Sequence, residues 1–92
     1  MSELGYILLE RKEYTQAIEA FRANVESSPQ SEYRNSELGY AYERAGDLAA
    51  AIRFYEAAVQ MARVNGAQRL PGYEADLRRV QKKMVAPAAK KA

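Results

Sequence analysis

Cysteine, histidine and tryptophan are all absent from the 92 residues of this chain. Without cysteine there is no disulfide framework and no thiolate metal site. Without histidine the chain lacks the commonest general base and the commonest metal ligand of proteins. No run of about 18 apolar residues occurs either, so we expect no membrane span. Residues 1–4 have no basic lead and no long apolar core follows them, so we expect no signal peptide and, by default, a cytoplasmic protein.

What is present is the composition of one small globular domain, with 48% hydrophobic and 28% charged residues and seven tyrosines. The charges are unevenly distributed. Residues 1–62 hold six Lys/Arg against ten Asp/Glu, whereas residues 63–92 hold eight against two. We expect these acidic and basic parts either to attract each other or to attract different partners.

An internal repeat organises the chain. The pentapeptide Ser-Glu-Leu-Gly-Tyr at residues 2–6 returns at residues 36–40, an offset of 34 residues. Four more identities follow at the same offset: Ala17 with Ala51, Ile18 with Ile52, Ala23 with Ala57, and Val25 with Val59. This agreement is hard to attribute to chance, and a period of this length is typical of stacked repeats.

Each unit predicts two helices. In unit two, residues 32–66, the spacing of Leu38, Tyr42 and Ala45 forms one helical face, and Gly46-Asp47 ends one helix and caps the next. Apolar residues at helical spacing follow, namely Ala51, Ile52, Tyr55, Ala58 and Val59. Unit one, residues 1–31, has the same pattern, with Leu4 and Leu8 expected to face the core and Lys12-Glu13 in place of Gly-Asp.

One further helix is predicted over residues 70–85. Tyr73, Leu77, Val80 and Met84 recur at spacings of four, three and four, which indicates an amphipathic helix. We expect it to cap the stack by packing against Ile52 and Val59. Residues 86–92 are predicted to form a mobile basic tail.

The 34-residue period and several fixed residues resemble the tetratricopeptide repeat family, whose pattern is W-x2-L-G-x2-Y, then A-x3-F, then P. Unit two supplies Leu38, Gly39, Tyr42, Ala51 and Tyr55, and unit one supplies Leu4, Gly5, Ala17, Phe21 and Pro29. Leu8 stands where Tyr is usual, and Met1 and Asn35 replace the Trp. The resemblance implies an all-α fold, an α-solenoid of two helix pairs plus a C-terminal capping helix, in one domain over residues 1–85.

The resemblance also implies a protein-binding groove on the inner face of the first helices. In this sequence that face carries Tyr6, Leu9, Glu10, Tyr33, Ser36, Tyr40, Glu43 and Arg44. Tyr6 and Tyr40 occupy equivalent positions, and tyrosine is enriched at interfaces. Because the set is aromatic and acidic, we expect a basic or apolar peptide or protein as partner. The bland alternative is that the rings merely cover the packing beneath them.

Other functions have weaker support. Glu10 and Glu43 could be imagined as a catalytic pair or a metal site, but helix-surface carboxylates are usually solvated and no nucleophile motif accompanies them. We therefore expect no enzyme activity, no metal and no cofactor. The basic residues Arg69, Arg78, Arg79, Lys82, Lys83, Lys90 and Lys91 offer electrostatic nucleic-acid binding as an alternative, which no recognised motif supports. A third possibility is an oligomerising or regulatory appendage of a larger enzyme.

Self-association is the last expectation. Leu4, Ile7 and Leu8, with Leu9, make the first helix apolar on nearly every side, whereas an end unit should show a polar outer face. We expect the chain to cover Ile7 by forming a homodimer, because a two-fold dimer is the commonest closed assembly.

Overall fold

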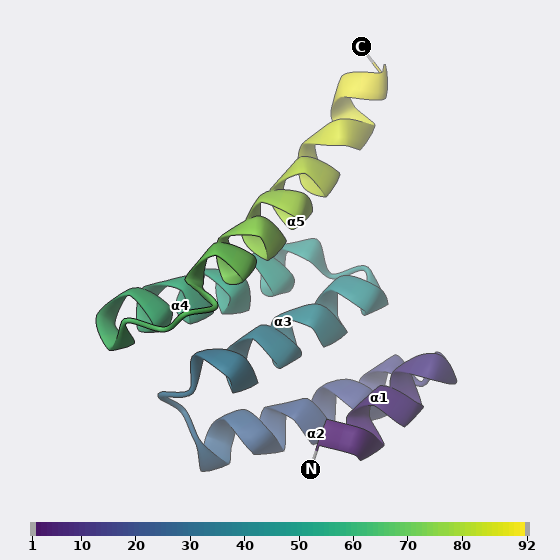
Figure 1. The fold of residues 1–92 in the computed structure, drawn as a ribbon. Coiled ribbons are helices and arrows are strands. Elements are labelled where there is room, and N and C mark those ends of the chain that lie inside the picture. The colour runs from purple at the N-terminus through teal and green to yellow at the C-terminus, as the bar shows by residue number, and fades with distance from the viewer. Residues whose placement is uncertain (1, 92) are drawn as a thin grey trace.

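The computed structural model describes the backbone of residues 2–91 and the side chains of residues 3–85 (Figure 1). Its five helices are α1 (Ser2–Glu10), α2 (Tyr14–Ser27), α3 (Glu32–Ala45), α4 (Leu48–Asn65) and α5 (Leu70–Lys91). No strand occurs over residues 2–91, which confirms the predicted all-α class. The predicted end of the last helix at residue 85 is wrong, because α5 continues to Lys91. The side chains of the predicted basic tail, residues 86–92, lie outside the described part of the chain.

The helices stack in chain order. Figure 1 shows α1 and α2 at one end and α5 at the other, with α1, α3 and α5 on the near side and α2 and α4 behind them. The main contacts join helices that are consecutive in the chain. Each pair therefore covers only its neighbours, as in other repeat proteins.

Glycine in each first helix permits a close crossing with the second helix. A Cβ added to Gly5 would lie 2.5 Å from the ring of Phe21, and one added to Gly39 would lie 3.2 Å from the ring of Tyr55. Phe21 and Tyr55 stand 34 residues apart and are both almost fully buried. The two units thus use the same crossing, in which an aromatic ring fills the space that the missing side chain leaves.

The main core joins unit one to α3. Leu9, Phe21 and Leu38 are each about 1% exposed or less and belong to one cluster with Ala17 and Ala41. The expectation that Leu4 faces the core is wrong, because Leu4 is 56% exposed. Its equivalent Leu38 is covered by unit one, and no described residue covers Leu4 in the same way.

The capping helix packs as predicted. Tyr73 of α5 is buried with Val59 of α4, and Leu70 and Leu77 pack against that cluster. Val80 is fully buried in a second cluster, against which Ile52 packs. This confirms that α5 covers the apolar flank that unit two would otherwise expose.

The two turns inside the units have the same backbone and different residues. In unit two the amides of Gly46 and Asp47 donate to the carbonyls of Glu43 and Tyr42. In unit one the amides of Lys12 and Glu13 donate to the equivalent carbonyls, 34 residues earlier. Gly46 has a φ of 90°, and Lys12 is held at a φ of 61°, where a side chain is strained.

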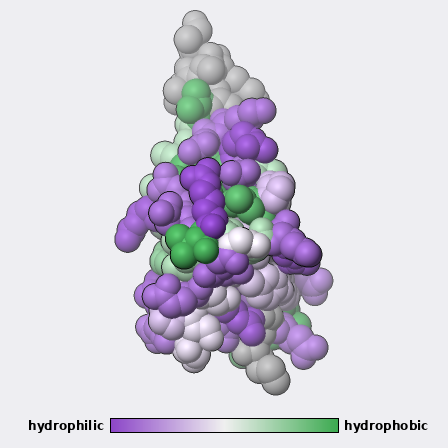
Figure 2. Space-filling model, turned by 60° about the vertical axis from the view of Figure 1, so that its left-hand side comes forward, coloured by the Kyte–Doolittle hydropathy of each residue, from purple (hydrophilic) through white to green (hydrophobic). Residues whose placement is uncertain are grey.

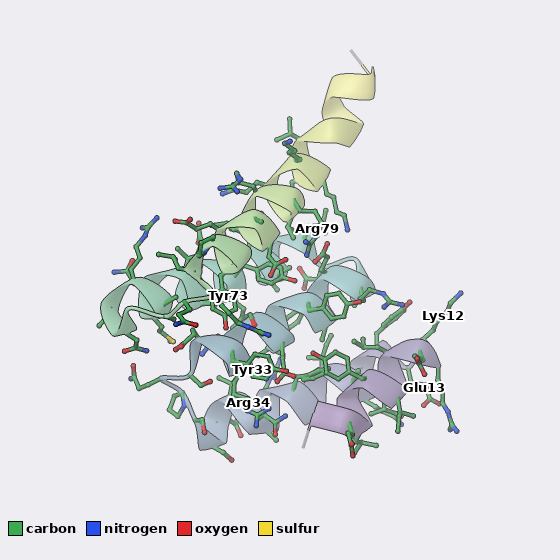
Figure 3. All side chains as sticks on the ribbon, viewed as in Figure 1. Lys12, Glu13, Tyr33, Arg34, Tyr73 and Arg79 are labelled. Atoms are coloured by element: carbon green, nitrogen blue, oxygen red, sulfur yellow. The ribbon has the colours of Figure 1, made fainter. Side chains whose placement is uncertain are left out.

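The N-terminal caps of α2 and α4, which follow these two turns, also differ. The Asp47 side chain accepts a hydrogen bond from the amide of Ala50 at 3.1 Å, whereas Glu13 at the start of α2 makes no side-chain cap. Figure 3 shows Lys12 and Glu13 together at the α1–α2 turn. The first unit therefore begins its second helix from the weaker of the two turns.

Replacing the residues of the turn in unit one by those of the turn in unit two should stabilise the chain. We expect Lys12→Gly to raise the free energy of unfolding by roughly 0.5–1 kcal/mol, because glycine adopts a positive φ without strain. Adding Glu13→Asp should contribute about 0.5–1 kcal/mol more through the new cap. Urea denaturation measures both. The mirror variant Gly46→Lys should lose stability, and a Lys12→Gly chain no more stable than the parent would contradict the assignment of strain.

Candidate functional site

An open pocket of about 440 Å³ lies on the inner side of the stack. We call it the inner pocket. Four helices line it: α1 with Tyr6, α3 with Tyr33, Ser36, Glu37, Tyr40, Glu43 and Arg44, α4 with Tyr55, and α5 with Asp76, Arg79 and Lys83. The α3 residues recur at spacings of three, one, three, three and one, so a single helical face supplies most of the wall.

Tyr6 and Tyr40 meet across the pocket. Their ring centroids lie 6.4 Å apart, and the Tyr6 ring also packs edge-on against Phe21 at 5.1 Å. The Tyr6 hydroxyl donates to Glu37 at 3.1 Å. Burial raises the pKa of Tyr6, and the neighbouring Glu37 carboxylate raises it further, so the hydroxyl remains a donor. Tyr6 is nevertheless 38% exposed, which leaves part of its ring open to a partner.

Tyr33 and Tyr40 each lie against guanidinium groups. Tyr33 is 42% exposed, and the guanidinium carbons of Arg34 and Arg69 lie 5.6 Å and 5.8 Å from its ring centroid. Arg44 lies 5.8 Å from the ring centroid of Tyr40 and donates to the Tyr40 hydroxyl at 3.1 Å. Cations held over aromatic faces in this way contribute cation–π attraction and restrict the rings.

Glu43 is the most connected group of the inner pocket. Its carboxylate accepts hydrogen bonds from Tyr55 at 2.9 Å, from Arg79 at 3.0 and 2.8 Å, and from Lys83 at 2.6 Å. Figure 3 shows Arg79 reaching from α5 toward α3. Burial would raise the pKa of Glu43, but the hydrogen bonds from Arg79, Lys83 and Tyr55 outweigh it and lower the pKa to about 2.

Six of the eight residues predicted for the binding face line the inner pocket, namely Tyr6, Tyr33, Ser36, Tyr40, Glu43 and Arg44. The prediction for Leu9 is wrong, because its side chain is 1% exposed and packs in the core between the units. Glu10 is exposed but lines a separate depression with Glu3, Tyr6 and Ile7.

Sequence reasoning missed five lining residues: Glu37, Tyr55, Asp76, Arg79 and Lys83. The sequence does contain a pattern that indicates the three residues from α5. Asp76, Arg79 and Lys83 recur at spacings of three and four, which places them on one helical face. That stripe lies beside the apolar one that predicted the helix.

The expectation of an acidic groove is wrong. The lining holds three carboxylates, Glu37, Glu43 and Asp76, and three cations, Arg44, Arg79 and Lys83. Two of the carboxylates are covered as well, with side-chain exposures of 2% for Glu37 and 4% for Glu43. The argument for a basic partner therefore loses its support in the inner pocket.

The rest of the described surface has fewer features that indicate a functional site. On the face shown in Figure 2 hydrophilic side chains predominate, and hydrophobic ones form small separate groups. Among the described residues no cluster of three or more carboxylates could hold a metal ion. Within the same part of the chain, no helix combines the length and the apolar character that crossing a membrane requires.

The stacked pairs and their shared inner face define a helical-repeat protein. Models of the tetratricopeptide repeat match residues 1–32 and residues 35–65. The chain belongs to the tetratricopeptide repeat family, whose repeats generally mediate protein–protein interaction and are typically not catalytic. No significant match is found among curated proteins or among solved structures.

The ion pairs of Glu43 predict an acid-sensitive stability. Its pKa is below the ordinary value of 4.5 in the folded chain, so its contribution is complete above pH 4.5 and is lost as the pH falls toward 2. We expect the free energy of unfolding, measured by urea denaturation, to fall over this range by roughly 1–3 kcal/mol more for the parent chain than for Glu43→Gln. Glu56→Gln, at an exposed position on α4, is the control and should keep the parent slope. Equal slopes for the parent chain and Glu43→Gln would contradict the role given to Glu43.

Proposed function

We propose that this chain is a binding scaffold whose inner pocket receives an extended or helical segment of a partner protein. The observation that carries the proposal is the set of tyrosines Tyr6, Tyr33 and Tyr40 around one open pocket. Two of them are more than a third exposed, although each is held by neighbouring side chains. The membership of a family of interaction repeats supports the same function.

Held rings make effective anchors. A tyrosine presents a large apolar surface and a polar hydroxyl, and it loses little conformational freedom on binding when its ring is already restrained. Tyr6 is restrained by Phe21 and Glu37, and Tyr40 by Arg44. The sequence leads us to expect a basic or an apolar partner. These rings support an apolar partner, whereas the covered carboxylates of Glu37 and Glu43 do not support a basic one.

Removal of the most exposed ring tests the pocket. Tyr33→Ala should weaken binding of a selected peptide about tenfold, the effect expected for an aromatic anchor, while changing the melting temperature little. Tyr40→Ala should abolish capture of the peptide, but Tyr40 packs against the core, so its folding must be checked by circular dichroism. Val64→Ala is the control, because Val64 is 77% exposed on α4 and does not line the pocket. Fluorescence anisotropy measures the affinities, and full binding by Tyr33→Ala would exclude this use of the pocket.

We further propose that two copies associate through α1. Ile7 is 48% exposed and Leu4 is 56% exposed, whereas their equivalents Ala41 and Leu38 in α3 are covered by unit one. Leu8 is partly buried and supports this face from beneath. A second copy would cover Ile7 and Leu4 in the same manner.

The charges beside Ile7 favour an antiparallel two-fold contact. Glu3, Ile7 and Arg11 are spaced by four residues along one stripe, and both charged side chains are exposed. A two-fold axis at Ile7 would set Glu3 of one copy against Arg11 of the second copy, twice. Opposite charges at the rim of an apolar contact set its register, although each pair contributes little energy.

Light scattering over a concentration series tests this contact. We expect the parent chain to exceed its 10.3 kDa monomer mass at high concentration and Ile7→Glu to remain monomeric. Glu3→Arg should weaken the dimer and Arg11→Glu in the same chain should restore it. The control Val64→Glu changes an exposed apolar residue of α4 and should leave the association unchanged. A parent chain that stays monomeric throughout would show that the exposed face is tolerated.

A further inference from the structure

Equal numbers of charges do not make the inner pocket neutral to a ligand, because its cations and carboxylates differ in accessibility. The Glu37 and Glu43 side chains are 2% and 4% exposed. The cations bound to Glu43 are far more open, at 44% for Arg79 and 50% for Lys83. Glu43 therefore lies beneath Arg79 and Lys83, and the third carboxylate of the lining, Asp76, is 34% exposed but paired with Arg79. A ligand entering the pocket meets more ammonium and guanidinium groups than open carboxylates.

The number of hydrogen-bond donors left to a ligand can be counted. Arg79 uses Nε and both terminal nitrogens on Glu43, Asp76 and Tyr55. Lys83 has three N–H donors, of which one meets Glu43. Arg44 has five, which also serve the hydroxyls of Tyr40 and Tyr14, and no carboxylate among the described residues pairs with it. Lys83 and Arg44 thus keep most of the free donors of the pocket.

We propose that the inner pocket selects an acidic segment of a partner protein, with side-chain carboxylates on Arg44 and Lys83 and an apolar or aromatic side chain against Tyr6 and Tyr40. This inference rests on the proposed function and specifies its ligand. It also reverses the basic partner expected from the sequence. Charge-assisted hydrogen bonds are the strongest that such a pocket offers, so they would dominate selectivity among peptides of equal apolar content.

A peptide fits these observations better than a single-stranded nucleic acid does. Nucleic-acid affinity grows with the number of cations that neutralise phosphates. The lining of the inner pocket holds three cations, and the partly exposed Asp76 lies beside one of them, so a continuous phosphate chain would find few partners there.

Selection from a random peptide phage library on the immobilised chain tests the inference. We expect enriched sequences to combine Asp or Glu with Leu, Phe or Tyr. Enrichment of lysine- and arginine-rich or uncharged peptides would overturn the acidic preference and leave the proposed function standing. No enrichment over a Tyr33→Ala, Tyr40→Ala chain would overturn both. Tighter binding of oligo-dT than of the best acidic peptide would also overturn the inference.

Variants then locate the carboxylate contacts. Arg44→Gln and Lys83→Gln should each weaken the selected peptide by roughly three- to tenfold, and its Glu→Gln analogue should lose the same factor on the parent chain. Lys82→Gln, the adjacent exposed residue of α5 outside the pocket lining, is the matched control and should bind as the parent does. Arg44→Gln is the decisive variant, because Arg44 holds no ion pair with any described residue and its loss should change the melting temperature little. Undiminished binding by both Arg44→Gln and Lys83→Gln would overturn the assignment.

Discussion

The close crossing of the two helices in each unit is the constraint on which the rest of the structure depends. Gly5 and Gly39 leave space that the rings of Phe21 and Tyr55 fill, and a Cβ at Gly5 would collide with Phe21. This crossing fixes the angle between the helices of a pair. Because both units use it, the second pair continues the first in the same sense, and the first helices share one inner face.

One atom distinguishes the two crossings. Phe21 and Tyr55 occupy the same position, but Tyr55 carries a hydroxyl that donates to Glu43 at 2.9 Å. That bond helps to satisfy a carboxylate that α3 buries, and Arg79 and Lys83 from α5 complete the set. A buried carboxylate without such partners would be strongly destabilising. The packing of α3 on α4 and the docking of α5 are thereby linked through one side chain.

Local patterns in the sequence predicted the repeats, the helices and the packing of α5 on Val59, because period and apolar spacing are properties of nearby residues. The prediction for Leu9 is wrong because a helix that is apolar on nearly every side has no single inner face. The sequence pattern predicts a surface carboxylate at Glu43, because its ion-pair partners, Arg79 and Lys83, lie 36 and 40 residues further along the chain. Contacts of this range depend on the stacking angle, which the sequence pattern does not contain.

The uneven charge of the chain is partly resolved inside the fold. Arg79 and Lys83 belong to the basic part and bind Glu43 of the acidic part, so the two parts do attract each other at this point. The same cations also remain 44% and 50% exposed at the pocket. Holding α5 in place and presenting positive charge to the pocket are consequently one arrangement. A change that frees Glu43 would loosen the capping helix and make the pocket more acidic at once, so stability and charge selectivity should vary together.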